Sequence, residues 1–288
     1  MAGFGARLAG RMRATDSRVV IGLDPHMGRI REIPRFAAMS DPDAAREFCL
    51  GILEGCHDLA CAVKPQVAFF ERWGAPGWEA LVAVVAAARE RGLPVILDAK
   101  RGDIGSTASA YATHLDPAGP IGADALTVNA YLGGDAMEPF LEACDRWGAG
   151  LFVLVKTSNP GSSDLQDLRL ADGRRVCEAM ADLVAAWSEG REANDPWGPV
   201  GAVVGATHPQ DVAALRQRMP RSILLLPGVG AQGGDPAKLR SAFGDDGLGA
   251  CVNSSRSLLY AWEAADLPPE RFVEATRLAA ESLRAQLA

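Results

Sequence analysis

The chain repeats one pattern eight times: a short, almost wholly apolar run is followed by a longer stretch in which apolar residues recur every three or four positions. Such runs are typical of strands buried on both faces, and the longer stretches are typical of amphipathic helices. The predicted strands are Val19–Asp24, Cys61–Gln66, Pro94–Lys100, Ala125–Asn129, Gly150–Lys156, Val200–Thr207, Ser222–Pro227 and Gly249–Asn253. The predicted helices are Asp43–Leu59, Trp78–Arg91, Thr107–His114, Ala136–Trp147, Val176–Glu189, Pro209–Met219, Pro236–Phe243 and Pro269–Gln286.

Alternating strands and helices of this kind predict a parallel sheet covered by helices. Eight units favour a closed (β/α)8 TIM barrel, and 288 residues suit one such barrel, which typically takes ~250 residues. The alternative, an open doubly wound sheet, usually carries a glycine-rich turn after its first strand. Here that strand ends in Leu-Asp-Pro-His at positions 23–26. We therefore predict an α/β protein in which residues 1–288 form a single barrel domain.

Two connections are longer than the others and are expected to extend over the end of the barrel where the strands finish. Residues 26–40 follow the first strand and residues 157–199 follow the fifth. The second connection contains its own helix, and Asp172-Gly173 predicts a short hairpin within it.

The segment before the first strand predicts a short surface helix. Phe4, Leu8 and Met12 recur every four residues and form one face. Arginines interrupt the segment and leave no continuous apolar core, so it does not resemble a secretory signal.

Composition and charge exclude several classes of protein. Apolar residues make up 48% of the chain and charged residues 23%, as in globular proteins. A formal net charge of −7 argues against simple electrostatic binding of nucleic acid. The longest apolar run, Leu81–Ala88, is far shorter than the ~20 residues that span a bilayer, so we expect no membrane association.

Cysteine and histidine usage points to a cytoplasmic protein without a metal site. The six cysteines form no CxxC pair and are expected to be reduced, buried thiols. The four histidines show neither HxH nor HExxH spacing.

Lysine is scarce: 25 of the 29 basic residues are arginine, and the four lysines are Lys64, Lys100, Lys156 and Lys238. Lysine is a compact charge that can surrender a proton, whereas a guanidinium hardly can. We therefore expect lysine to mark positions where arginine would fail.

Polar residues or glycine stand at or just after the end of nearly every predicted strand. Burying polar groups is costly unless they line a common site, and in barrels this end of the strands carries the active site. The residues concerned are Asp24, Lys64, Asp98, Lys100, Asn129, Lys156, Thr207, Gly228 and Asn253.

The densest charge cluster lies on and after the third strand. Side chains two apart on a strand point to one face, so Asp98 and Lys100 share a face, and Asp103 follows in the turn. A carboxylate beside an ammonium keeps both charged at neutral pH. Alone, the pair is equally consistent with a structural ion pair, with Asp103 as a helix N-cap. With Lys64 on the neighbouring strand, four charges converge, a network that is more often functional than stabilising.

The pattern DxKRxDI at positions 98–104 resembles the signature of the orotidine 5′-phosphate decarboxylase family, and the resemblance extends over almost the whole chain. The length and the long inserts resemble the larger bacterial subfamily, type 2. Five further segments fit in order: Leu-Asp-Pro at 23–25, Val-Lys-Pro-Gln at 63–66, Lys-Thr-Ser-Asn-Pro-Gly at 156–161, Pro-Gly-Val-Gly-Ala-Gln-Gly-Gly-Asp at 227–235 and Asn-Ser-Ser-Arg at 253–256.

The resemblance implies decarboxylation of orotidine 5′-monophosphate to uridine 5′-monophosphate and CO2, the last step of de novo UMP synthesis, without metal or organic cofactor. It also implies a homodimer in which Lys64, Asp98 and Lys100 act within one subunit and Asp103 reaches into the partner's site. Lys100 is then the proton donor to C6, and Asp98 lies where the departing carboxylate must be. A fixed cation is the available stabiliser for the carbanion that CO2 leaves behind.

Two features after the last strands predict a phosphate site. Four glycines lie within residues 228–234, where backbone N–H groups can approach an anion, and Arg256 carries a planar fork that suits phosphate. Barrels frequently bind phosphate with the loops after strands seven and eight. The resemblance implies that Arg256 is the main phosphate cation and that Ser255 contributes its backbone amide. It also implies that Gln232 and Gly233 bind the phosphate and the base.

The nucleoside end rests on the resemblance alone. Ser158 is implied to hydrogen-bond the pyrimidine edge, and Asp24 and Thr107 to bind ribose hydroxyls, with Thr107 from across the dimer. The resemblance assigns no role to Lys156, for which a salt bridge at the barrel mouth is expected. Lys238 is expected to be solvated surface.

Three alternatives remain. A magnesium-dependent sugar-phosphate aldolase or decarboxylase of the same suprafamily shares the Asp-x-Lys-x-x-Asp core, but it would need an acidic ligand near strand two, where Lys64 stands and only Glu71 follows. A Schiff-base aldolase would use Lys100 as nucleophile, which Asp98 disfavours by keeping it protonated. A non-catalytic nucleotide-binding barrel would keep the pocket without the reaction.

Overall fold

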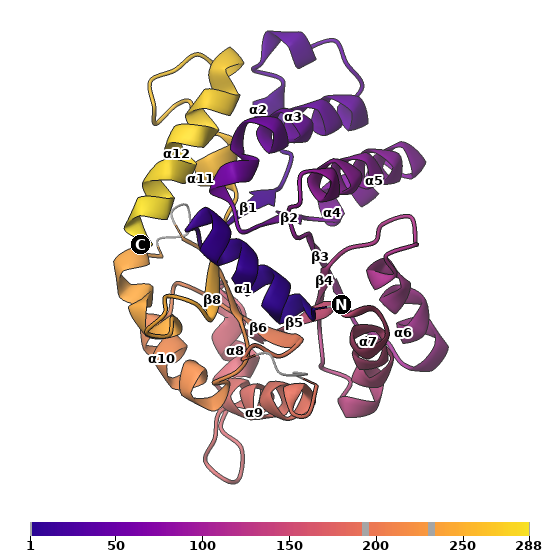
Figure 1. Ribbon diagram of the computed structural model, residues 1–288, viewed down its shortest axis with the longest axis vertical. Helices are drawn as coiled ribbons and strands as arrows, with labels where there is room; N and C mark the ends of the chain where they lie inside the picture. The colour runs from indigo at the N-terminus through magenta and orange to yellow at the C-terminus, as the bar shows by residue number, and fades with distance from the viewer. Residues whose placement is uncertain (1, 192–195, 230–233, 288) are drawn as a thin grey trace.

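Eight parallel strands form one closed ring, with helices around it (Figure 1). The computed structural model describes residues 2–191, 196–229 and 234–287. The strand order is β2-β1-β8-β7-β6-β5-β4-β3. Two single bridges, Val63 with Val95 and Gln66 with Asp98, join β2 to β3 and close the ring. The predicted (β/α)8 barrel is therefore confirmed.

The strands coincide with the predicted apolar runs, with small differences at their ends. They are β1 (Val19–Leu23), β2 (Ala62–Pro65), β3 (Ile96–Arg101), β4 (Ala125–Val128), β5 (Gly150–Lys156), β6 (Val200–Val204), β7 (Leu224–Pro227) and β8 (Ala250–Ser254). The described α-helices are α1 (Phe4–Thr15), α2 (Met27–Ile30), α3 (Asp41–Cys56), α4 (Ala68–Glu71), α5 (Ala75–Glu90), α6 (Gly105–Ala112), α7 (Gly134–Trp147), α8 (Ser163–Gln166), α9 (Val176–Ser188), α10 (Pro209–Arg218), α11 (Arg256–Leu259) and α12 (Phe272–Gln286).

One predicted helix takes a different form. Residues Pro236–Ala242 form a 3-10 helix, in which the Lys238 N–H bonds to the Asp235 carbonyl. The Asp235 side chain also accepts from the Ala237 N–H at 3.0 Å. So short a segment gains little from the cooperativity that favours an α-helix, so the tighter turn is retained.

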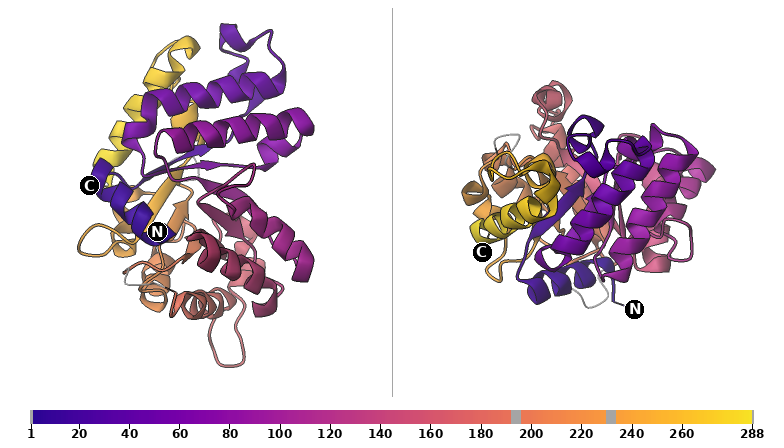
Figure 2. Two further views of the ribbon diagram at one scale, coloured as in Figure 1. Left: turned by 45° about the vertical axis from the view of Figure 1, so that its right-hand side comes forward. Right: turned by 90° about the horizontal axis from the view of Figure 1, so that it is seen from above.

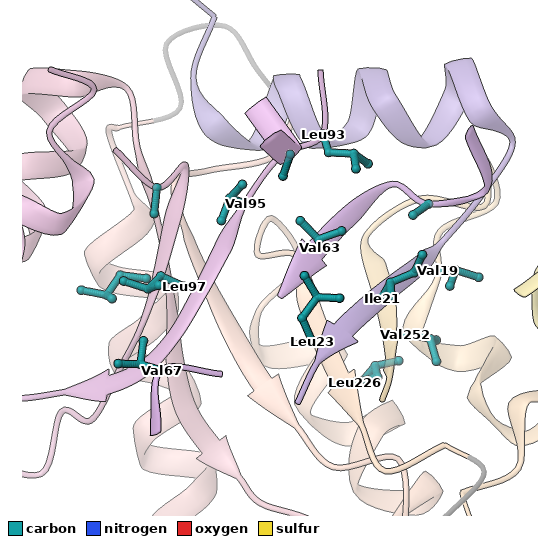
Figure 3. Packing of buried hydrophobic residues seen from close by; sticks show 14 of the residues in the cluster. Val19, Ile21, Leu23, Val63, Val67, Leu93, Val95, Leu97, Leu226 and Val252 are labelled. Atoms are coloured by element: carbon teal, nitrogen blue, oxygen red, sulfur yellow. The ribbon is translucent and has the colours of Figure 1, made fainter. Parts of the chain in front are cut away.

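Each strand divides its apolar side chains between two layers. Val19, Ile21 and Leu23 of β1 belong to the larger cluster, which packs the strands against the surrounding helices (Figure 3). Val20, between them, belongs to a second cluster inside the barrel. Burial on both faces explains why the strands are apolar throughout rather than alternating.

Helix α1 closes the N-terminal end of the barrel (Figure 1). Its residues Phe4, Leu8 and Met12 are buried in the inner cluster, and the Phe4 ring meets the Phe152 ring edge-on with centroids 5.8 Å apart. The predicted helix is confirmed, but its apolar face is a plug for the barrel rather than a surface feature.

Residues 26–40 and the first part of the second connection, residues 157–175, lie at the other end of the barrel from α1, and the segment after β5 projects furthest (Figure 2). The last part of that connection returns to α1, where Trp197 joins the inner cluster. The buried Lys156 ends β5, and its Nζ bonds to Asp167 Oδ2 at 2.7 Å, which ties the long connection to the strand. A bridge between Arg169 and Arg175, with Gly173 at a φ of 87°, forms the predicted hairpin. The expected salt bridge of Lys156 is also confirmed.

All six cysteines are buried and free of disulfides. Burial raises the pKa of Cys56 and Cys61 to about 12, so these thiols stay protonated at neutral pH. Among the described helices, none has both the length and the apolar character needed to cross a bilayer.

We predict that Phe4→Ala lowers the free energy of unfolding by about 3–5 kcal/mol, because it removes a large buried ring and leaves a cavity at the base of the barrel. Urea unfolding measures the change. The matched control is Leu278→Ala on α12, where the side chain is half exposed, and a change within about 0.5 kcal/mol is expected. Equal losses in the two variants would show that α1 does not stabilise the barrel.

Candidate active site

A cavity of about 430 Å³ opens among the C-terminal ends of the strands. It is the end of a barrel at which catalytic groups are found. Seven of the predicted site residues line it: Asp24, Lys64, Asp98, Lys100, Ser158, Ser255 and Arg256.

The carboxylate of Asp98 lies between two lysines. Its Oδ2 accepts a hydrogen bond from Lys64 Nζ at 2.6 Å, and its Oδ1 accepts one from Lys100 Nζ at 2.5 Å. The Lys64 side chain is only 5% exposed, whereas the Lys100 side chain is 45% exposed. Lys100 is therefore the member of the group that a ligand in the cavity can reach most easily.

Two neutral side chains complete the shell of Asp98. Gln66 Nε2 donates to Oδ2 at 3.0 Å, and Thr127 Oγ1 donates to Oδ1 at 3.0 Å. A carboxylate offers about four acceptor positions, and all four are used. Burial alone would raise the pKa of Asp98, but the charges and hydrogen bonds of Lys64 and Lys100 hold that pKa well below its usual range. Asp98 therefore remains ionised.

The same cluster keeps Lys64 charged. Burial by itself lowers the pKa of Lys64, but the carboxylates of Asp98 and Asp24 outweigh burial and raise that pKa above its ordinary value. A buried ammonium with two nearby carboxylates thus stays protonated at neutral pH.

Strand β3 is irregular where it enters the site. The pairing with β4 shifts between Leu97 and Arg101, and Lys100 has a φ of 48°, in the left-handed region. The side chains of Asp98 and Lys100 meet as predicted, but through this bulge and not through the alternation of a regular strand.

Asp24 and Asn253 each present a buried oxygen atom to the cavity. In the described part of the chain, neither Asp24 Oδ1 nor Asn253 Oδ1 has a hydrogen-bond partner. The hydroxyl of Tyr260 fixes the loop at Asp24, because it donates to the Asp24 carbonyl at 2.8 Å and accepts from the His26 N–H at 2.7 Å. Buried acceptors are rarely left unpaired, so these two oxygens suit a ligand with hydroxyl or N–H donors.

The predicted phosphate end is only partly described. Gly228 and Arg256 line the cavity, and Gly228 has a φ of 101°, which favours glycine. The Gly234 N–H bonds to the Gly228 carbonyl at 3.0 Å and closes the base of the loop. The predicted contacts Gln232 and Gly233 lie outside the described residues.

Two glycines allow close approaches that place cavity residues. A Cβ at Gly22 on β1 would lie 2.0 Å from Ser255 Oγ, and one at Gly205 after β6 would lie 2.9 Å from the Ser158 nitrogen. Larger residues would push Ser255 and Ser158 out of position.

Asp103 and Thr107 do not line the cavity of this chain. Thr107 lies exposed on α6, and Asp103 Oδ1 accepts from the Ile104 N–H at 2.8 Å. Three of the four predicted charges therefore converge within this chain, and Asp103 stands apart. The N-cap of α6 is Ile104 and not Asp103.

Sequence reasoning gave no role to Gln66 or Thr127, the two neutral partners of Asp98. Gln66 follows Lys64 by two positions, so the spacing alone predicts that the two side chains share a strand face. Thr127 is the polar residue inside the buried strand β4, and such a residue needs a hydrogen-bond partner. Neither signal identified Asp98 as that partner.

The four lysines divide into three kinds. Lys64 and Lys100 line the cavity. Lys156 is buried but turns to Asp167 and does not line the cavity, and Lys238 is exposed. Lys64 and Lys100 therefore belong to the candidate site, whereas Lys156 forms the salt bridge expected for it at the end of β5.

The additional acidic ligand that a magnesium site would require near β2 does not line the cavity among residues 2–191, 196–229 and 234–287, where β2 contributes Lys64 and is followed by Gln66. Glu71 forms an ion pair with Arg101 and does not line the cavity. Within the same ranges, no group of three or more His, Cys, Asp or Glu side chains is placed to hold a metal ion.

A closed (β/α)8 barrel with a charged cavity at the strand ends is the architecture of an enzyme. A family model described as orotidine 5′-phosphate decarboxylase / HUMPS family matches residues 17–263. An orotidine 5′-phosphate decarboxylase of Rhodopirellula baltica is 46% identical over 271 residues, which cover 90% of this chain and 88% of that protein. One from Roseiflexus castenholzii is 48% identical over 273 residues, which cover 93% and 91%.

A solved structure agrees with these relatives. The OMP decarboxylase of Leishmania donovani matches with a TM-score of 0.77 and 36% identity, over 98% of this chain and 99% of that one. The chain belongs to the orotidine 5′-phosphate decarboxylase family.

We predict that Asp98→Asn lowers the pKa of Lys64 below its ordinary value, because burial is then no longer offset by the nearest carboxylate. Lysine side-chain NMR over a pH series measures this, and four lysines make assignment practical. We also expect kcat to fall by at least about 100-fold. The control is Asp58→Asn, which removes an exposed partner of Arg277 and should change neither quantity. Titration of Lys64 at its wild-type pH in Asp98→Asn would contradict the assigned coupling.

Proposed function

We propose that Lys64, Asp98 and Lys100 carry out the reaction that family membership assigns to this chain. That reaction is the decarboxylation of orotidine 5′-monophosphate to uridine 5′-monophosphate and CO2 in pyrimidine nucleotide synthesis. The observation that carries the proposal is the ionised Asp98 held between two ammonium groups in the cavity.

The chemistry needs a fixed cation next to the reacting carbon. The bond between C6 and the carboxylate carbon breaks, CO2 leaves, and the electron pair remains on C6. A proton then moves from Lys100 Nζ to C6, and Lys100 regains a proton from water. An ammonium that is already in place stabilises the developing carbanion without reorganisation. Lysine is required because arginine does not give up its proton readily.

Asp98 and Lys64 prepare the proton donor. The Asp98 carboxylate holds the Lys100 ammonium by its Oδ1 at 2.5 Å, and Lys64 neutralises the opposite oxygen. Because Asp98 is ionised and carries no proton, it is not the group that delivers the proton. We assign it the position facing the substrate carboxylate.

Polar groups around the cavity bind the rest of the nucleotide. The unpaired Asp24 Oδ1 supports a hydrogen bond from a ribose hydroxyl. Ser158 lines the cavity, where the absence of a side chain at Gly205 leaves room for it, and it binds the pyrimidine edge. The phosphate is bound by Arg256, the Ser255 amide, and Gln232 with Gly233.

We further propose a homodimer in which Asp103 and Thr107 enter the partner's site. Their surroundings support an interface: Ile104, Tyr131 and Leu132 are all at least half exposed, and Tyr131 is 74% exposed. Large apolar side chains gathered on one surface mark interaction sites. Ile104 directly follows Asp103, and the turn at Gly102 lies against the loop that leads to Tyr131, since a Cβ at Gly102 would lie 2.5 Å from the Asn129 carbonyl oxygen.

The sugar-phosphate and Schiff-base alternatives are less favoured. Both oxygens of Asp98 accept hydrogen bonds from ammonium groups, so Asp98 itself has no free acceptor for magnesium. An ion-paired Lys100 is a poor nucleophile. We propose a cofactor-independent, single-domain enzyme, with buried free thiols in keeping with a cytoplasmic location.

We predict that Lys100→Ala abolishes decarboxylation while the protein remains folded, because no other group is placed to protonate C6. The assay follows the absorbance of orotidine 5′-monophosphate, and circular dichroism checks the fold. The control is Lys238→Ala, which removes an exposed lysine and should leave turnover unchanged. Wild-type activity should persist in excess EDTA. Turnover by the Lys100→Ala variant, or loss of wild-type activity in EDTA, would overturn the assignment.

A complementation experiment tests the shared site. Neither Lys100→Ala nor Asp103→Ala is expected to be active alone. In a mixed dimer one site combines the intact Lys100 of one subunit with the intact Asp103 of the other. Random exchange in a two-fold dimer should restore about a quarter of wild-type activity. If co-expressed subunits form mixed dimers without regaining activity, Asp103 does not act across the interface.

A further inference from the structure

Strand β3 contains more residues than its neighbour β4 over the segment that enters the site. Leu97 pairs with Leu126, and Arg101 pairs with Val128, so β3 advances four residues while β4 advances two. The additional residues form a bulge, and bulges leave backbone N–H groups without partners in the strand ladder.

The hydroxyl of Thr127, which lies on β4 opposite the bulge, supplies the missing partner. Thr127 Oγ1 accepts from the Ala99 N–H at 3.0 Å and from the Lys100 N–H at 2.9 Å. Lys100 has a left-handed backbone there, which a lysine adopts only when its surroundings impose it. One buried hydroxyl thus anchors the backbone from which the Lys100 side chain extends.

The proton of the Thr127 hydroxyl has one well-placed hydrogen-bond acceptor. A hydroxyl has two acceptor lone pairs and one proton, and the two N–H groups take both lone pairs. Asp98 Oδ1 lies 3.0 Å from Thr127 Oγ1, whereas the Leu97 carbonyl lies 3.5 Å away and is the poorer acceptor. Asp98 Oδ1 also holds the Lys100 ammonium. Thr127 is therefore linked to Lys100 at both ends, directly at its N–H and through Asp98 at its ammonium.

We propose that Thr127 is a positioning residue that sets where the Lys100 ammonium and the Asp98 carboxylate stand relative to the reacting carbon. This inference rests on the roles proposed above for Lys100 and Asp98. A valine would fill the same space but would leave the part-buried Ala99 and Lys100 N–H groups without their acceptor and remove one donor from Asp98. The Lys100 backbone would then lose the contact that holds its left-handed turn.

The main test is Thr127→Val. We expect kcat to fall on the order of 100-fold, the size of effect that a misplacement of about 1 Å produces. KM should stay within about threefold, because the groups proposed to bind the nucleotide come from other strands. The matched control is Thr276→Val on α12, which also removes a buried hydroxyl, bonded to the Leu258 carbonyl at 2.9 Å. That control should lower stability without changing kcat.

A second pair of variants tests the role of Thr127 even if the Thr127→Val protein folds poorly. Thr127→Ser and Thr127→Cys both lack the methyl group, but serine keeps a strong acceptor and donor, whereas a thiol is weak in both roles. We expect Thr127→Ser to keep kcat within about fivefold of wild type, since the hydroxyl geometry can be rebuilt. Thr127→Cys should fall at least about tenfold below it, because the N–H groups lose their acceptor.

The outcomes separate this inference from the proposed function. Equal kcat in the serine and cysteine variants, or a folded valine variant with wild-type kcat, would overturn the role of Thr127. A valine effect confined to KM would do the same. If Lys100→Ala retained turnover in the same assay, the role of Lys100 would fail instead, whatever the Thr127 series showed.

Discussion

The structure depends on how a buried carboxylate is kept charged. Asp98 is nearly removed from water, and an ion in that position is tolerated only when opposite charges and hydrogen bonds replace its hydration. Lys64 from β2, Thr127 from β4 and Lys100 from its own strand provide them. Three adjacent strands must therefore be held in register to within the tolerance of a hydrogen bond. The outer helices and the plug at the base of the barrel serve that requirement.

The two ends of the barrel have separate tasks. At the N-terminal end, α1 fills the opening with buried apolar side chains such as Phe4. At the C-terminal end, strands end in polar residues, β3 is bulged, and β2 meets β3 through single bridges only. The strand pairing is therefore irregular at the end that holds the candidate active site, and the packed N-terminal end holds the strands in place.

Lysine and arginine are used for different purposes in this chain. Arginine serves most surface ion pairs, where a permanent charge is sufficient. Lys64 and Lys100 stand in the cavity, where a compact ammonium fits beside a carboxylate and its proton can be transferred. Lys156 shows that scarcity alone is not a functional signal, because this buried lysine binds Asp167 and anchors the connection after β5.

The sequence by itself predicted the fold and the position of the charged cluster. Apolar runs alternating with amphipathic stretches determined the eight strands and the barrel, because burial on both faces leaves a continuous apolar signature. Charges at strand ends determined where Lys64, Asp98 and Lys100 would gather, since parallel strands end at one edge. Only the tertiary structure decided three features: the bulge in β3, the four hydrogen bonds that Asp98 accepts, and the contacts of Thr127 with Asp98 and the β3 backbone. These depend on the register between strands far apart in sequence, and hydrophobic patterning along a single strand does not encode that register.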